Sequence, residues 1–176
     1  QALARQRDAR TVTVALMDGR TALAVEVSLP VAQGATATVL VAEDEMIVGF
    51  DLCDTVKEAG FDVSGPYDTA QSAFDAIAQR RPDLAILDIK MPVCDGVEAT
   101  KIISAEKLCP VILVTAFSQR EIIESARDAG ALAFLVKPYQ KSDLIPAMEM
   151  AIARFRELQA LSVQNDVLDE KLEARK

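Results

Sequence analysis

The chain has 176 residues, with 27 acidic against 19 basic residues, a net charge of −8 and no histidine. This charge argues against a nucleic-acid-binding surface in these residues, and the missing histidine excludes a histidine base, a histidine metal ligand and a phosphohistidine. No apolar run approaches the roughly 18 residues of a membrane span, so we expect no membrane partner. Three cysteines without a C-x-x-C pair favour a reducing cytoplasm over a disulfide framework or a zinc site.

The first segment, residues 1–37, differs from the rest of the chain. Two β-rich runs, 11–17 and 21–27, flank Asp18-Gly19-Arg20, a pattern typical of a β-hairpin. Because two strands alone are only marginally stable, this hairpin must pack against another element or be poorly ordered. We expect an N-terminal extension and linker without chemistry of its own, which could be the tail of a preceding domain.

From residue 38 onward, short apolar runs alternate with segments of helical periodicity. Strands are expected at 39–42, 61–64, 84–87, 111–114 and 133–136, and helices at 45–59, 69–79, 95–105, 118–130 and from 142 or 143 onward. Strands that alternate with helices in this way predict right-handed crossovers and a parallel sheet. Residues 38–150 are therefore expected to form one doubly wound α/β domain with five parallel strands.

Two local patterns refine the helix predictions. The first helix is indicated by the helical spacing of its apolar residues Ile47, Phe50, Leu52 and Val56. The sequence Ser118-Gln119-Arg120-Glu121 is a capping-box pattern and predicts that the fourth helix opens at Ser118.

The last helix continues past the expected end of the domain, over residues 151–176. Its apolar or seam positions follow heptad intervals with one extra three-residue step, which is typical of a coiled coil. A polar residue at one seam position, Asn165, can fix a two-stranded register. A helix folded back on its own domain is the alternative. The predicted seam is Ile145, Met148, Ile152, Phe155, Leu158, Leu161, Asn165, Leu168 and Leu172.

Reactive side chains follow four of the five expected strands. The carboxyl ends of parallel strands meet at one edge of the sheet, so residues far apart in sequence are expected to converge there. A lone acid after a strand more often caps a loop, but the set as a whole indicates a site. Its members are Glu43, Asp44, Asp88, Thr115 and Lys137.

Such a cluster supports phosphoryl transfer. Crowded carboxylates raise each other's pKa unless a cation joins them, and a hard oxygen site with few carboxylates suits Mg²⁺. One carboxylate can act as a nucleophile and accept a phosphoryl group. A metal ion, a lysine and a hydroxyl can then stabilise the charge of the transferring group.

These motifs together resemble the response-regulator receiver domain. The resemblance is carried by residues 39–45, by 87–92 followed by Asp95-Gly96, and by 114–116 and 136–138, and it covers about residues 38–150. It implies a flavodoxin-like fold with strand order 2-1-3-4-5. It also implies a phosphorylated signalling switch in the cytoplasm rather than an enzyme, with a sensor histidine kinase as partner.

The resemblance also implies a phosphoacceptor and a metal site. Asp88 would accept the phosphoryl group. Mg²⁺ would be held by Glu43, Asp44, Asp88 and the main-chain carbonyl of Lys90. The acid pair here is Glu-Asp rather than the commoner Asp-Asp, and the longer Glu43 is still expected to reach the metal.

Further roles follow from the same resemblance. The groups expected to bind the phosphoryl oxygens are Thr115, Ala116 and Lys137. Thr115 and Phe134 would form the switch, with plain core packing as the alternative for Phe134. Lys90 and Phe117 flank the path of attacking water in this family, and we expect a long side chain and a ring there to slow dephosphorylation.

The carboxyl-terminal part is similar to a narrower class, the ANTAR antitermination response regulators. The similar segments are 115–120, 126–131, 136–139, 142–147 and the long helix that ends at 172–176. In that class a coiled coil follows the receiver and a small three-helix RNA-binding domain follows the coiled coil. This implies RNA control through an output domain beyond Lys176. It also implies homodimerisation through the C-terminal helix, or through the face built by helix 118–130, strand 133–136 and the last helix.

Other functions stay open from the residues alone. A stand-alone receiver would act by protein–protein interaction without an output domain. A phosphohydrolase would use Asp88 with turnover, but such enzymes usually place a second acid two residues on, where Lys90 stands. A flavin-type binder on the same fold is disfavoured because no Ser/Thr/Gly-rich loop follows the first strand of the domain.

Overall fold

The computed structural model describes residues 9–18, 21–30 and 36–173, and the chain divides into two units, Gln1–Ala35 and Thr36–Lys176. In the first unit, β1 (Ala9–Asp18) pairs antiparallel with β2 (Thr21–Pro30), from Ala9 opposite Pro30 to Asp18 opposite Thr21. This confirms the expected hairpin-like pairing, with longer strands. Residues 19–20 of the predicted turn and residues 31–35 of the predicted linker lie outside the described residues.

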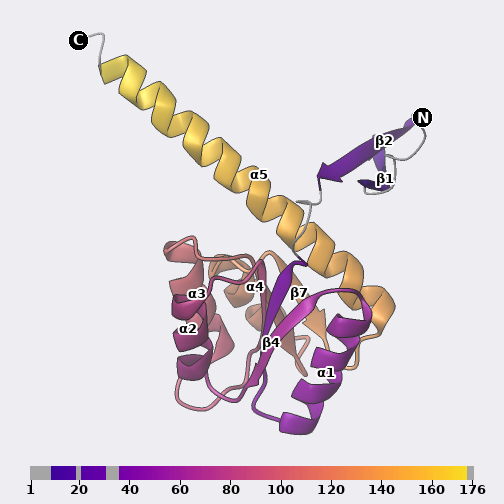
Figure 1. Ribbon diagram of the computed structural model, residues 1–176, viewed down its shortest axis with the longest axis vertical. Helices are drawn as coiled ribbons and strands as arrows, with labels where there is room; N and C mark the ends of the chain where they lie inside the picture. The colour runs from indigo at the N-terminus through magenta and orange to yellow at the C-terminus, as the bar shows by residue number, and fades with distance from the viewer. Residues whose placement is uncertain (1–8, 19–20, 31–35, 174–176) are drawn as a thin grey trace, which may run out of the picture. The chain divides into compact units, whose positions relative to one another are not determined.

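A parallel sheet with helices on both faces forms the second unit (Figure 1). Its strands lie in the order β4-β3-β5-β6-β7, which is 2-1-3-4-5 when counted within the unit and confirms the predicted topology. The strands are β3 (Thr38–Ala42), β4 (Asp62–Tyr67), β5 (Leu84–Asp88), β6 (Val111–Thr115) and β7 (Ala133–Val136). The helices are α1 (Met46–Glu58), α2 (Ala70–Gln79), α3 (Gly96–Ala105), α4 (Arg120–Asp128) and α5 (Lys141–Glu173).

The continuous apolar runs of the central strands fill two cores, one on each face of the sheet. Since successive side chains of a strand point to opposite faces, Leu40 packs with α2, α3 and α4 while Val39 and Val41 pack with α1 and α5. All five residues of β5 and of β6 are buried. A strand covered on both faces holds its carboxyl end rigidly at the sheet edge, which is where the reactive residues lie.

Side-chain caps mark the starts of α2 and α3, whereas α4 starts at another residue than predicted. Thr69 caps α2 by accepting from the Ser72 N–H, and Asp95 caps α3 by accepting from the Glu98 N–H. The capping box predicted at Ser118 is wrong. The first helical carbonyl is that of Gln119, which accepts from the N–H groups of Ile122 and Ile123, so Ser118 lies one residue outside the helix.

The first helix forms as predicted, but only two of its four spaced apolar residues are buried. Leu52 and Val56 are buried, whereas Ile47 is 87% exposed and Phe50 is 55% exposed. The residue that faces the sheet there is Gly49, whose hydrogen occupies a position where a Cβ would lie 2.8 Å from the Cβ of Pro66. With Gly49 facing the sheet, the 3.6-residue period of the helix directs Ile47 and Phe50 away from it.

The first turns of α5 pack on the domain itself, so the seam prediction is wrong at its start. Leu144, Met148 and Ala151 are buried in the core shared with α1, and the half-buried Ile152 packs against it. Ile145 is half-buried. Further along, Leu158 is 42% exposed and Leu161 is 54% exposed. The predicted seam residues Asn165, Leu168 and Leu172 lie where only the helical backbone is described.

In the portion of the chain that the structure describes, no helix has both the length and the apolar character needed to cross a bilayer.

Candidate functional site

Four neighbouring strands deliver the predicted reactive residues to one edge of the sheet. Asp88 ends β5, Thr115 ends β6, Glu43 and Asp44 directly follow β3, and Lys137 directly follows β7. A cavity of about 200 Å³ opens between these strand ends. The residues that line it are Asp44, Glu45, Asp88, Lys90, Thr115, Ala116, Phe117 and Lys137.

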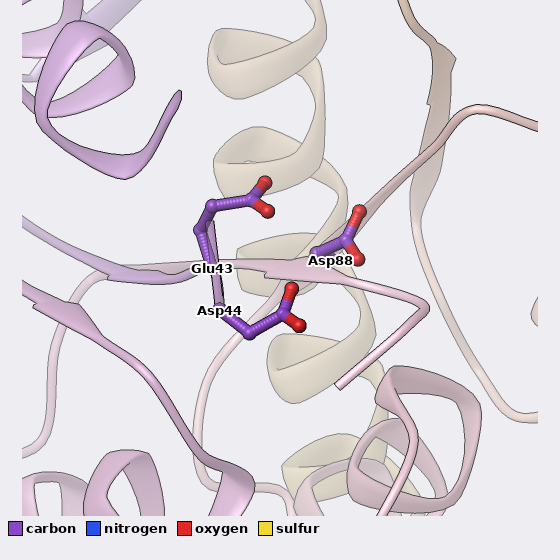
Figure 2. Close-up of side chains that lie close together, drawn as sticks. All are labelled: Glu43, Asp44 and Asp88. Carbon is purple, nitrogen blue, oxygen red and sulfur yellow. The ribbon is translucent and has the colours of Figure 1, made fainter. Parts of the chain in front are cut away.

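The three predicted carboxylates lie close together. Glu43, Asp44 and Asp88 each offer one oxygen, and these oxygens lie within 4.8 Å of one another. Figure 2 shows the three side chains converging from two neighbouring strand ends. Glu43 and Asp88 are buried, with 1% and 6% exposure, whereas Asp44 is exposed to solvent. The cluster is therefore held in the protein on one side and open to water on the other.

Lys137 bridges two of these acids. Its Nζ lies 2.6 Å from Oε2 of Glu43 and 3.0 Å from Oδ1 of Asp88. Its backbone N–H donates to the Thr115 carbonyl at 2.7 Å, which fixes the start of the β7–α5 loop against β6. The ammonium thus ties together side chains from three strands.

Burial and charge act in opposite directions on the pKa values of this pair. Burial raises the pKa of Glu43, and the hydrogen bond from Lys137 offsets only part of that effect. Burial alone would lower the pKa of Lys137, but its hydrogen bonds to Glu43 and Asp88 outweigh burial and raise it. The Lys137 ammonium contacts two of the three carboxylates, so the cluster has an excess of negative charge.

Backbone groups orient the Asp88 carboxylate. The N–H of Lys90 donates to Oδ2 of Asp88 at 2.8 Å, leaving Oδ1 to Lys137. Gly96 at the start of α3 packs directly on this segment, since a Cβ there would lie 2.2 Å from the Asp88 carbonyl oxygen. The sequence placed Gly96 in a motif, but its role as a space-saving residue became visible only in the fold.

The β6–α4 loop supplies the other wall of the cavity. Thr115 is 1% exposed, and its Oγ1 accepts from the Phe117 N–H at 3.2 Å. Ala116 lines the cavity beside it. Phe134 in β7 is half-buried and packs against the core under α2, α3 and α4, a position compatible with either predicted role, switch or plain core.

The side chains of Lys90 and Phe117 meet at the cavity. The Lys90 Nζ lies 4.1 Å from the centroid of the Phe117 ring, a cation–π contact. The sequence placed both residues beside the expected water path but gave no sign that they touch.

The donor set fits Mg²⁺. All three side chains offer carboxylate oxygens, the ligand type that hard cations prefer, and the exposed Asp44 leaves room for the waters that Mg²⁺ retains. A divalent cation would also balance the excess negative charge that Lys137 leaves.

Comparisons with known proteins point to one family. The description "Response regulator receiver domain" matches residues 39–149. The chain is 46% identical over 138 residues to the transcriptional regulatory protein PdtaR of Mycobacterium tuberculosis, a match that covers 78% of this chain and 67% of that protein. It is 31% identical over 111 residues to the chemotaxis protein CheY of Thermotoga maritima, covering 62% of this chain and 92% of CheY. The solved structure of Vibrio cholerae CheY4 matches with a TM-score of 0.62 and 27% identity over 66% of this chain and 99% of that one.

Proposed function

The chain belongs to the response regulator receiver domain family, and on that premise we propose that it is a phosphorylation switch with Asp88 as the phosphoacceptor. The observation that carries the proposal is the placement of the Asp88 carboxylate. One oxygen lies 3.0 Å from the Lys137 ammonium, the other accepts the Lys90 N–H at 2.8 Å, and the side chain lines an open cavity. The acid is therefore fixed in direction and open to a phosphoryl donor.

In the proposed step, a carboxylate oxygen of Asp88 attacks the phosphorus of a phosphohistidine on a sensor histidine kinase. A P–O bond forms, the P–N bond breaks, and its electron pair returns to the imidazole of the kinase. Lys137, Thr115 and Ala116 line the cavity where the phosphoryl oxygens would lie. Mg²⁺, held by Glu43, Asp44, Asp88 and the main-chain carbonyl of Lys90, would neutralise charge on the transferring group.

The kinase would contact the exposed apolar start of α1. Met46, Ile47 and Phe50 are 43%, 87% and 55% exposed, and α1 begins three residues after Glu43. Large apolar side chains that are turned outward beside a reactive site favour a protein as the donor.

The phosphorylated state would be transmitted through Thr115 and Phe134 to the face formed by α4, β7 and α5. Ile123, Val136 and Met150 are exposed apolar residues of these three elements, at 41%, 36% and 72% exposure. We propose that homodimers form through this face, through the exposed positions of α5, or through both. The exposed positions of α5 include Leu158 and Leu161.

We further propose that the output is control of transcription antitermination through RNA. Two observations support this proposal. The carboxyl-terminal sequence resembles the ANTAR class, and the chain is 46% identical to a transcriptional regulatory protein, in a match that covers 67% of that protein. RNA binding would belong to an output domain outside the residues given. The three free thiols are compatible with the cytoplasm as its location.

Lys90 and Phe117 would tune the lifetime of the phosphorylated state. Both side chains line the cavity beside Asp88, through which we expect water to reach the phosphoryl group. Replacing them by smaller side chains, Lys90→Asn and Phe117→Ala, is expected to shorten the half-life of phospho-Asp88. A half-life unchanged in both variants would contradict this role.

Incubation with acetyl phosphate and Mg²⁺, followed by intact-protein mass spectrometry, tests the proposed function. We expect one phosphoryl group on the wild-type chain and none on Asp88→Asn. Labelling of Asp88→Asn at the wild-type level would overturn the assignment. Continuous phosphate release from a phosphate ester by the wild-type chain, but not by Asp88→Asn, would instead favour a phosphohydrolase.

A further inference from the structure

The contact between Lys90 and Phe117 joins the two loops that carry the reactive groups. Lys90 lies in the loop after β5 and Phe117 in the loop after β6, and these strands are paired in parallel from Ala85 opposite Val111 to Asp88 opposite Val114. Their ends therefore lie next to each other at the sheet edge. The Lys90 ammonium, 4.1 Å from the centroid of the Phe117 ring, links the two loops at the cavity.

Both partners are also tied by their backbones to the groups that would meet a phosphoryl group. The Lys90 N–H donates to Oδ2 of Asp88 at 2.8 Å, and the Phe117 N–H donates to Oγ1 of Thr115 at 3.2 Å. A change at either oxygen is thus passed by one hydrogen bond to a member of the pair. This double attachment distinguishes the pair from an incidental surface contact.

The charge distribution explains why Lys90 uses a ring as its partner. Asp88 and Glu43 are already paired with Lys137, at 3.0 and 2.6 Å. A phosphoryl group on Asp88 would bring new negative charge into the same cavity. The attraction between an ammonium and a phosphoryl oxygen is stronger than that between an ammonium and the quadrupole of a ring.

We propose that the Lys90–Phe117 pair is a latch of the unphosphorylated state. On phosphorylation, which is the function proposed above, the Lys90 ammonium leaves the ring and pairs with the phosphoryl oxygens. Phe117 is then released together with the loop that leads to α4, which begins at Arg120. The latch links the charge on Asp88 to the α4 end of the signalling face by a route separate from the Phe134 side chain.

The latch has a spectroscopic signature, because protons above an aromatic ring are shifted upfield. In ¹H–¹³C NMR spectra we expect the Lys90 ε-CH₂ signal of the unphosphorylated protein to lie upfield of the other lysines, and Lys90→Met assigns it by its absence. Phe117→Leu is expected to move the signal to the ordinary lysine position. Acetyl phosphate with Mg²⁺ is expected to move it in the wild-type protein but not in Asp88→Asn.

Kinetics give a second readout. Loss of the ring contact is expected to make labelling by acetyl phosphate about three-fold faster in Phe117→Leu, because Lys90 can then pair with the phosphoryl oxygens without first breaking a cation–π contact. Lys101→Met is the matched control for Lys90→Met, because it removes an exposed lysine of α3 that pairs with Glu98. The Lys101→Met protein is expected to be labelled at the wild-type rate.

Mass spectra of the same samples separate the two proposals. A phosphorylated wild-type protein whose Lys90 signal stays upfield would overturn the latch and leave the phosphoacceptor intact. An ordinary Lys90 position before phosphorylation would overturn the latch as well. A wild-type protein that takes up no phosphoryl group would overturn the proposed function, and the latch with it.

Discussion

Among single residues, Lys137 has the largest electrostatic role in the site. Its ammonium lies between the buried carboxylates of Glu43 and Asp88, which would otherwise repel each other. Its raised pKa keeps Lys137 charged throughout the neutral range. Both acids were predicted from their positions after apolar strands, and so was the lysine. The site therefore depends on a cation at its centre, whether this is the lysine alone or the lysine with a metal ion.

Lys137→Met is expected to destabilise the fold and to make it more dependent on Mg²⁺. The substitution leaves two buried carboxylates without a cation, at a cost on the order of 2 kcal/mol, because Lys137 is partly exposed and the pair is worth less than a fully buried one. Urea unfolding with and without Mg²⁺ measures this. Mg²⁺ should raise the free energy of unfolding more in Lys137→Met than in the wild type, and an equal effect in both would contradict the shared site.

The cysteines are expected to differ in reactivity. Burial raises the pKa of Cys109 to about 12, so at pH 8 its thiol is protonated and also inaccessible. Cys53 is buried as well, whereas Cys94 is partly exposed in the β5–α3 loop. Iodoacetamide at pH 8 should modify Cys94 first in the native protein and all three thiols after unfolding in urea. Rapid native labelling of Cys109 would show that the core around α3 and β6 opens.

At the scale of single residues, the sequence did not show which side chains of the loops are in contact. The positions of Asp88, Thr115 and Lys137 follow from strand periodicity, because a parallel sheet brings its carboxyl ends together. The Lys90–Phe117 contact depends on the rotamers of two long side chains in loops, and no periodicity encodes these. Gly96 was visible as part of a motif, but its need to lack a Cβ follows from the 2.2 Å approach to the Asp88 carbonyl oxygen.

Among the elements, the β5–α3 loop contains a local conflict between residue and conformation. Val93 has a φ of 71° and is fully exposed. A β-branched residue is disfavoured in this left-handed region, and strain of this kind often lies beside functional sites. The loop lies between Lys90, whose backbone orients Asp88, and the Asp95 cap of α3.

Val93→Asn is expected to stabilise the protein by about 1 kcal/mol, because asparagine tolerates positive φ and no buried side chain is lost. Thermal unfolding measures the change, and Val97→Asn, at a partly buried position of α3 that packs on the core, is a control that should destabilise. A lower melting temperature for Val93→Asn would indicate that the valine side chain makes a stabilising contact.

Helix details were harder to predict than strands. Apolar spacing predicted the helix that forms α1, but it did not show that Gly49 occupies the sheet-facing position, where α1 approaches Pro66 closely. This approach is a tertiary distance, which a one-dimensional pattern does not contain. Ser118 has the right spacing for a capping box, yet the first helical carbonyl belongs to Gln119.

At the scale of the whole molecule, α5 has two roles along its length. Its first turns complete the core through Leu144, Met148 and Ala151, and its later turns expose Leu158 and Leu161. The parallel sheet followed from the alternation of strands and helices, and its strand order followed from the family resemblance. Neither indicated the point where α5 leaves the core. The heptad spacing, with its one extra three-residue step, continues through both parts.

Substitutions in the two parts of α5 are therefore expected to act differently. Met148→Ala should destabilise the domain by about 2–5 kcal/mol, as expected for a truncated core residue. The double substitution Leu158→Ala and Leu161→Ala should leave unfolding nearly unchanged at a protein concentration where the chain is monomeric, and should weaken self-association. Urea unfolding and analytical ultracentrifugation measure the two effects, and a monomeric wild-type chain at all concentrations would contradict a dimer through α5.

The most direct test of the phosphoacceptor site identifies the carboxylate that receives the phosphoryl group. After labelling with acetyl phosphate and Mg²⁺, borohydride reduction of the acyl phosphate marks the modified carboxylate, and tandem mass spectrometry locates it. We expect reduction at Asp88 alone, and we expect it to be lost when Mg²⁺ is chelated. Reduction at Glu43 or Asp44 instead, or none at Asp88 in a labelled protein, would contradict the claim that these strand ends form a phosphoacceptor site centred on Asp88.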